Sequence, residues 1–102
     1  MISLEKAFRD VLFLSREKNI QTLSDLDITP VYRKRILEEL ENVDYSEGPL
    51  EDVMINGADM WVFGKTIKNT EVYIKITMGN PSLSVVCISF HLAEHPMNYP
   101  LK

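Results

Sequence analysis

Residues 71–78 alternate polar and apolar at every position, in the order Glu-Val-Tyr-Ile-Lys-Ile-Thr-Met. Successive side chains of a strand point to opposite faces, so this period of two predicts a β-strand with two different faces. The apolar face, which we expect to be buried under helices, consists of Val72, Ile74, Ile76 and Met78. The polar face consists of Glu71, Tyr73, Lys75 and Thr77. The functional question is whether this polar face is a catalytic surface or an ordinary solvated one.

Two further segments, residues 60–67 and 84–91, have the β-branched and aromatic composition of strands. Turn signals at Lys68-Asn69 and Gly79-Asn80-Pro81 join them to residues 71–78. Because these connections are short, they predict an antiparallel meander of three strands.

The two rows of the last strand can be assigned by the same alternation. We expect one row to face the helices: Val86, Ile88 and Phe90. We expect the other row to share the face of Tyr73: Cys87, Ser89 and His91. On the first strand Trp61, Phe63 and Lys65 lie on one side, but both rows are partly apolar, so the pattern leaves their side open.

The N-terminal half is helical in pattern. Apolar residues at three- and four-residue spacings predict an amphipathic helix over residues 3–18. Thr29 followed by Pro30 is a strong helix start, and this second helix should run to about residue 41. Between residues 44 and 59 no period holds, which predicts an irregular loop long enough to be functional. The order helix, helix, strand, strand, strand predicts a single α+β domain over residues 1–102, with two N-terminal helices on one face of a three-stranded or slightly larger antiparallel sheet.

The charge distribution changes how the net charge of −4 is interpreted. Residues 1–59 hold 7 Lys and Arg against 13 Asp and Glu, a balance of −6. Residues 60–102 hold 4 against 2, a balance of +2. Because binding to a phosphate backbone depends on local patches of cations, the mildly basic strand half keeps nucleic acid among the possible ligands.

Composition also bears on the compartment. No apolar run approaches the roughly 18 to 20 residues that span a membrane, so we predict no membrane association. The chain has one cysteine, Cys87, which excludes an internal disulfide and fits a reducing compartment. We therefore expect a cytoplasmic protein.

The polar residues that the strands bring to one face suit the cleavage of RNA. That face is expected to gather Lys65, Tyr73, Lys75, Ser89 and His91. A histidine can take the proton of the ribose 2′-OH, a tyrosine can donate a proton or orient the phosphate, and lysines can stabilise the anionic transition state. Other aromatic residues could stack on splayed bases, namely Tyr45, Trp61 and Tyr99. This chemistry needs no metal and no other cofactor.

Other interpretations of the same residues stay open. The polar face is also what an ordinary solvated sheet presents, and for Trp61 we favour a packing anchor over a base-stacking residue. His91, Glu94 and His95 have a spacing that binds zinc on a helix, but Pro96 prevents a helix from continuing there. Cys87 lies in an apolar strand without a nearby base, so we read it as structural.

Several strand motifs resemble the motility quorum-sensing regulator (MqsR) toxin family, which belongs with the RelE-like bacterial toxins. They are Asp44-Tyr45 before the long segment, Trp61 on the first strand, Glu71-Val-Tyr-Ile-Lys-Ile on the second, and Val86-Cys-Ile-Ser-Phe-His on the third. The resemblance covers about residues 44–91. It implies an α+β fold, metal-independent cleavage of messenger RNA (mRNA interferase activity), and neutralisation by a cognate antitoxin protein.

Residue by residue, Tyr73 corresponds to the family's strand tyrosine implicated in cleavage, and Lys75 to the lysine two positions further on. Two positions depart from the pattern: Ser46 follows Tyr45 where the family has a catalytic lysine, and Val62 follows Trp61 where it has a glutamine. The sequence therefore supports two hypotheses. One is a toxin-like endoribonuclease that uses Tyr73 and the polar face around it. The other is an inactive protein of the same fold that binds a protein partner.

Overall fold

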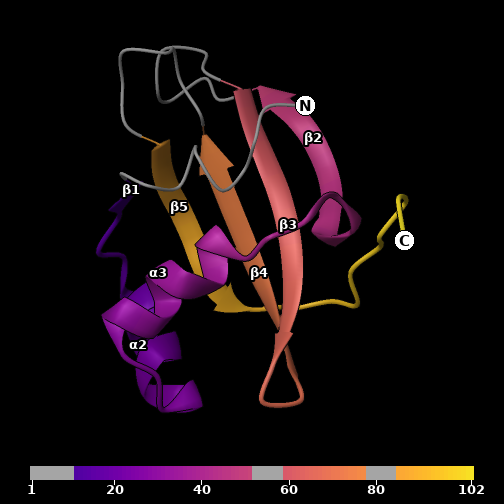
Figure 1. The fold of residues 1–102 in the computed structure, drawn as a ribbon. Helices are drawn as coiled ribbons and strands as arrows, with labels where there is room; N and C mark the ends of the chain where they lie inside the picture. The colour runs from indigo at the N-terminus through magenta and orange to yellow at the C-terminus, as the bar shows by residue number, and fades with distance from the viewer. Residues whose placement is uncertain (1–10, 52–58, 78–84) are drawn as a thin grey trace.

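The computed structural model describes residues 11–51, 59–77 and 85–102, and it shows an α+β architecture (Figure 1). Its elements are, in chain order, β1 (Val11–Phe13), α2 (Glu17–Leu26), α3 (Pro30–Glu38), a short 3₁₀ helix η2 (Asn42–Asp44), β2 (Tyr45–Glu51), β3 (Asp59–Ile67), β4 (Thr70–Thr77) and β5 (Val85–Leu92). Neither helix in the described part of the chain is long and apolar enough to cross a membrane.

The predicted meander is confirmed, but the sheet is larger than three strands and is not purely antiparallel. The strand order is β1-β5-β4-β3-β2. Strands β3, β4 and β5 pair antiparallel as the alternation predicted, and β2 adds to β3 in the same sense. Strand β1 instead pairs parallel with β5, Val11 opposite Val85 and Phe13 opposite Cys87. The sheet is therefore five-stranded and mixed.

The prediction of one helix over residues 3–18 is wrong for residues 11–16. Val11–Phe13 is a strand, and α2 begins only at Glu17. A short apolar run fits a strand as well as a helix, and β5 offers it unpaired backbone groups to bond with. Residues 1–10 lie outside the described residues, as do Met78 and the predicted turn at Gly79-Asn80-Pro81.

The predicted helix start at Thr29-Pro30 is confirmed. The Thr29 hydroxyl accepts the backbone N–H of Tyr32 at 3.1 Å, and Pro30 is the first helical residue. The helix ends at Glu38, before the predicted residue 41, and the chain turns through η2 into β2.

The expectation of an irregular loop over residues 44–59 is also wrong in its first half, because Tyr45–Glu51 forms edge strand β2. Two register shifts interrupt its pairing with β3 and hide the alternation that would reveal a strand in the sequence. Gly48 allows the strands to approach, since a Cβ there would lie 2.8 Å from the backbone oxygen of Met60. Residues 52–58 are not among the described residues.

The main core lies between α3 and one face of the sheet. Val72, Ile74 and Ile76 are fully buried there, as the alternation predicted, and they pack with Leu37 of α3. The expectation that both helices cover this face needs correction. Helix α3 crosses in front of the sheet, whereas α2 lies beside the lower half of β5, past the end of β1 (Figure 1).

A β-bulge in β5 changes which residues share a face. Lys75 pairs with Ser89, but the next residue of β4, Ile76, pairs with Cys87, so Ile88 is left without an opposite residue. The bulge moves Cys87 into the core row beside Ile76, where it is buried. The expectation that Cys87 shares a face with Ser89 is therefore wrong.

The same shift corrects the helix-facing row. Phe90 pairs with Ile74 in the main core, as predicted. Val86 instead pairs with Thr77, in the row of Lys75. Ile88 is buried but does not belong to the core cluster under α3.

Candidate functional site

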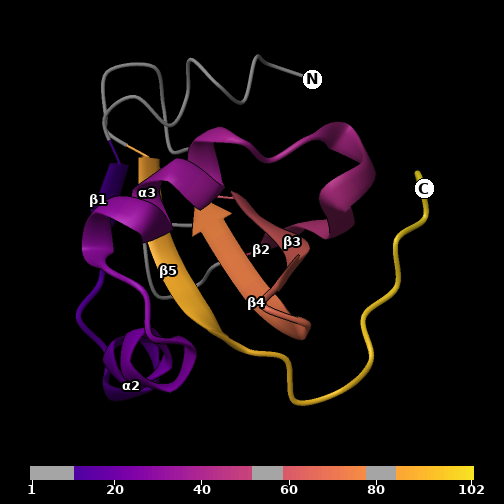
Figure 2. The same ribbon diagram turned by 60° about the horizontal axis from the view of Figure 1, so that its bottom comes forward.

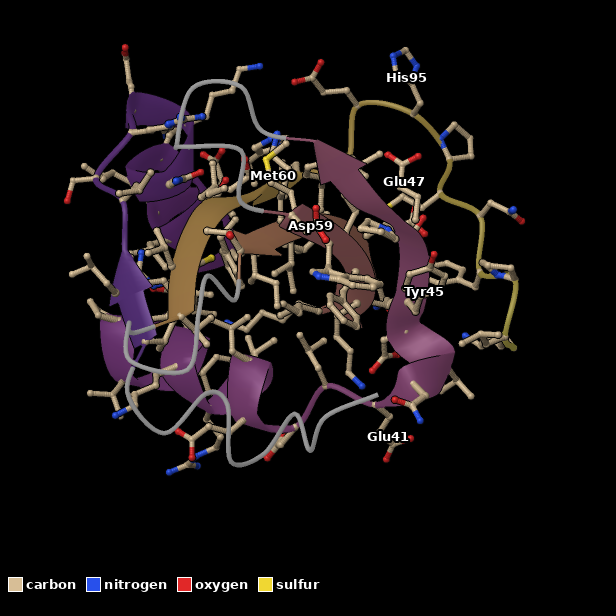
Figure 3. The ribbon with its side chains drawn as sticks, turned by 90° about the horizontal axis from the view of Figure 1, so that it is seen from above. Glu41, Tyr45, Glu47, Asp59, Met60 and His95 are labelled. Atoms are coloured by element: carbon tan, nitrogen blue, oxygen red, sulfur yellow. The ribbon has the colours of Figure 1, made fainter. Side chains whose placement is uncertain are left out.

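The polar row predicted on β4 and β5 forms the floor of a groove. Tyr73 pairs with His91, and Lys75 pairs with Ser89, so these four residues share the sheet face that α3 does not cover. They line a groove of about 920 Å³. Figure 3 shows two further lining residues, Glu47 and His95, on the opposite side of the sheet from Glu41. The predicted juxtaposition of these four polar residues is thus confirmed.

Tyr73 and His91 are in direct ring contact. Their ring centroids lie 5.0 Å apart with 12° between the planes, a stacked arrangement. Nδ1 of His91 lies 2.9 Å from the backbone oxygen of Leu92. Because a carbonyl only accepts, this contact assigns the proton of the neutral ring to Nδ1 and leaves Nε2 as its basic nitrogen. The stack and the hydrogen bond together fix the orientation of the ring.

Tyr73 is partly buried, and this sets its protonation state. Burial raises the pKa of the Tyr73 phenol, and the nearby carboxylate of Glu47 raises the pKa further. Both effects disfavour the phenolate. Tyr73 is therefore a neutral hydrogen-bond donor at physiological pH.

Lys75 and Ser89 are, like the Tyr73 hydroxyl, polar groups of the floor without a partner in the described residues. Neither side chain has a hydrogen-bond or ion-pair partner within residues 11–51, 59–77 and 85–102. Ser89 is only 5% exposed. The free ammonium and the free hydroxyl lie on neighbouring strands, directly opposite each other. Such groups are available to a ligand.

The first turn of α2 forms one wall of the groove. Asn19 holds it there. Beyond the end of β1, the Asn19 side chain bonds to the backbone of β5 in the way that a neighbouring strand would. The Asn19 side chain donates to the backbone oxygen of Ile88 at 3.0 Å and accepts the backbone N–H of Phe90 at 3.0 Å. These two bonds flank Ser89 and therefore place the start of α2 directly against it.

The C-terminal segment after β5 forms the opposite wall. The Glu71 carboxylate accepts the backbone N–H of Met97 at 3.1 Å and the hydroxyl of Tyr99 at 2.7 Å. Tyr99 and Met97 cover Gly64, where an added Cβ would lie 2.2 Å from the Tyr99 hydroxyl oxygen. In Figure 2 this segment leaves β5 and passes along the sheet to its far edge. The alternation places Glu71 on the polar face, and its structural task is to anchor this wall.

Four of the eight predicted site residues are not part of the groove. Lys65 pairs with Val72 in the core-facing row and makes an ion pair with Asp44 at 3.1 Å. Its placement beside Tyr73 is therefore wrong, because Gly64 occupies that position on β3.

The three predicted base-stacking residues are used for packing. Trp61 lies opposite Ile76 in the core-facing row and packs against the core. Tyr45 contacts the rings of Trp61 and Phe63, each at 6.3 Å between centroids. The hydroxyl of Tyr99 donates a hydrogen bond to Glu71. Burial, and to a lesser extent this hydrogen bond, raises the pKa of the Tyr99 phenol. None of the three lines the groove.

Several groove residues escaped the sequence reasoning. Arg16, Asn19 and Glu47 line the groove. Arg16 falls within the helix predicted over residues 3–18, Asn19 follows its predicted end, and Glu47 falls within the loop predicted over residues 44–59. Ser46 and Val62, the two positions that depart from the toxin-family pattern, line it as well. The pairing of β2 with β3 brings Ser46 there, whereas Val62 lies on β3 opposite Lys75.

The proposed zinc ligands do not form a metal site. Glu94 is engaged in an ion pair with Lys18. The described segments hold no group of three or more His, Cys, Asp and Glu side chains that could bind a metal ion. The alternative of a metal-dependent hydrolase built on His91, Glu94 and His95 therefore has no ligand set in these segments.

The chain matches no protein-family model, and no curated protein and no solved structure is significantly similar to it.

Proposed function

We propose that this protein is a metal-independent endoribonuclease of the MqsR-like and RelE-like toxin type, acting on messenger RNA in the cytoplasm. The observation that carries the proposal is the stacked Tyr73–His91 pair beside the unpaired ammonium of Lys75, on the floor of one groove. The resemblance of the strand motifs supports it. The positions of Ser46 and Val62 also support it. The toxin family has a functional lysine and glutamine at these two positions, and both positions line the groove.

In this proposal each group has its own role. Nε2 of His91 takes the proton from a ribose 2′-OH, and the 2′-oxygen attacks the adjacent phosphorus. Tyr73 gives its proton to the leaving 5′-oxygen, and a 2′,3′-cyclic phosphate remains on the upstream fragment. Lys75 lies two residues along β4 from Tyr73, roughly 6 to 7 Å, and stabilises the charge that develops on the phosphoryl oxygens. His91 then releases its proton to solvent and Tyr73 takes one up from solvent, so both groups return to their starting protonation states.

Cleavage of a mixed-sequence RNA by the purified protein, in the presence of a chelator, tests this proposal. Tyr73→Phe and His91→Ala should each abolish cleavage, and the products of the unchanged protein should end in cyclic phosphates. Lys65→Ala is the matched control, because that lysine lies on the other face. Cleavage that survives both Tyr73→Phe and His91→Ala would refute the assignment of the site.

A second candidate function is favoured by the charges of the groove. Among the described residues, three carboxylates line the groove (Glu17, Glu47 and Glu94) and so do three Lys and Arg side chains (Arg16, Lys18 and Lys75). This balance, with Ser46 and Val62 in place of the family's polar residues, suits an inactive protein of the toxin fold that binds a protein partner. In the first proposal that partner is the neutralising antitoxin.

Expression in a bacterial host separates the two functions. Growth arrest that a neighbouring gene relieves supports the toxin and contradicts the purely binding role. If expression is harmless, Ser46→Lys tests the departure from the family pattern: a gain of RNA cleavage would show that the groove is otherwise competent.

A further inference from the structure

The start of α2 leaves hydrogen-bond donors free at the groove. This helix has ten residues, and its N-cap, Arg16, makes no side-chain capping bond. The backbone N–H groups of Glu17, Lys18 and Asn19 have no acceptor among the residues that the structure describes. All three residues line the groove. A helix N-terminus with free N–H groups carries a partial positive charge that favours an anion.

Ser89 is a second and independent indication of a ligand. It is one of the few buried polar residues, and its hydroxyl has no partner in the described part of the chain although it lines the groove. Among the described residues the fully enclosed side-chain atom without a partner is Nε of Arg33, so the Ser89 hydroxyl oxygen is accessible from the groove and can bond to a ligand there. Asn19 bonds to the backbone on both sides of Ser89, so the free end of α2 and the free hydroxyl are adjacent.

Two cations complete the arrangement. Lys75 lies directly opposite Ser89, and Arg16 lines the groove at the start of α2. Neither is paired with a carboxylate in the described residues. The carboxylate of Glu94 is occupied by Lys18, which leaves Glu17 as the carboxylate on this wall that opposes an anion.

We infer that this end of the groove is a phosphate-binding subsite formed by the first turn of α2, the Ser89 hydroxyl and the Lys75 ammonium. Free N–H groups, a hydroxyl and a cation are the donors that phosphate oxygens accept. That the phosphate belongs to RNA rests on the proposed function. The binding of phosphate itself is independent of that function. The subsite binds the phosphate next to the one that Tyr73 and His91 act on. It thereby fixes which phosphodiester bond of the RNA lies at these two residues.

Titration of the isotopically labelled protein with inorganic phosphate at constant ionic strength, followed by amide NMR, tests the subsite. The amide signals of residues 17–19 and 89 should shift and saturate. Ser89→Ala should weaken binding about five- to tenfold, the loss expected for one hydrogen bond. Lys75→Gln should weaken it at least as much, and Glu17→Gln should strengthen it. The matched controls are Ser24→Ala on the exposed side of α2 and Lys65→Gln on the other sheet face, which should change nothing.

The outcomes separate this inference from the proposed function. The same titration with a dinucleotide bearing a 3′-phosphate, compared with the dephosphorylated form, distinguishes a nucleotide phosphate from the free ion. Phosphate-dependent shifts in a protein that cuts no RNA support the subsite and contradict the enzyme. RNA cleavage without any shift at residues 17–19 and 89, or shifts that Ser89→Ala and Lys75→Gln leave unchanged, overturns the subsite.

Discussion

Lys65 and Asp44 form an ion pair, with Nζ 3.1 Å from Oδ2, and Lys65 projects from the sheet face opposite to Tyr73 and His91. Asp44 also accepts the backbone N–H of Glu41 at 2.9 Å, which closes the turn before β2. Lys65 therefore stabilises the connection between α3 and β2. It has no access to a substrate in the groove.

Lys65→Met should lower the free energy of unfolding by about 1 kcal/mol, the typical value of a partly exposed ion pair. RNA cleavage by this variant should stay within about twofold of the unchanged protein. Lys75→Met should show the opposite behaviour, with cleavage reduced about a hundredfold or more and little change in stability. Urea denaturation and a cleavage assay on the same preparations measure both quantities. Equal losses of cleavage in the two variants would contradict the placement of Lys65.

Asn19→Ala should be among the most destabilising single substitutions of a polar residue. The Asn19 side chain is 2% exposed, and it bonds to the backbone oxygens of Leu14 and Ile88 and to the N–H of Phe90. Each buried backbone group that loses its partner costs roughly 1–3 kcal/mol, so we expect a loss of about 3 kcal/mol. Gln21→Ala is the control on the same helix, since the Gln21 side chain is exposed and donates to the carboxylate of Asp25 one turn away. Similar denaturation midpoints for the two variants would refute the role of Asn19.

Cys87 should remain a protonated and unreactive thiol in the folded protein. Burial raises the pKa of its thiol to about 12 and outweighs the opposing effect of the nearby Arg33, whereas an exposed thiol titrates near 8.5. Because the unfolded chain loses this proton first, the thiol's contribution to stability is complete below about pH 8.5 and falls as the pH rises toward 12.

Between about pH 9 and 12 the free energy of unfolding should therefore decline with a slope of up to about 1.4 kcal/mol per pH unit from this one group. In Cys87→Ala the slope should be shallower by up to that amount, because the tyrosines contribute equally to both proteins. A thiol reagent should label Cys87 only after denaturation. Rapid labelling of the folded protein at neutral pH would contradict the burial of the thiol.

Tyr99→Phe should loosen the C-terminal wall of the groove without unfolding the sheet. The change removes the 2.7 Å hydrogen bond to Glu71, worth roughly 1 kcal/mol at this partly exposed position. Hydrogen exchange at the amide of Met97, which shares the Glu71 carboxylate, should become several-fold faster. Tyr32→Phe is the control, because Tyr32 is exposed on α3. Unchanged exchange at Met97 would show that the segment is held by other contacts.

The sequence determined those parts of the protein that depend on local spacing. The alternation over residues 71–78 correctly separates the buried Val72, Ile74 and Ile76 from Tyr73 and Lys75, because a strand cannot place neighbouring residues on one face. The helix start at Thr29-Pro30 was predictable for the same kind of reason, since capping and the fixed φ of proline act within one turn.

The tertiary structure decided everything that depends on pairing between distant segments. Strand β1 is a strand because β5 has a free edge, and the bulge at Ile88 decides that Cys87 belongs to the core. Both rows of β3 are partly apolar, so its alternation does not show which row faces α3. The tertiary structure decides that the row of Trp61 and Lys65 does. Local chemistry placed Tyr73 and Lys75 on one face, but only long-range hydrogen bonds and burial brought Ser89 and the first turn of α2 beside them.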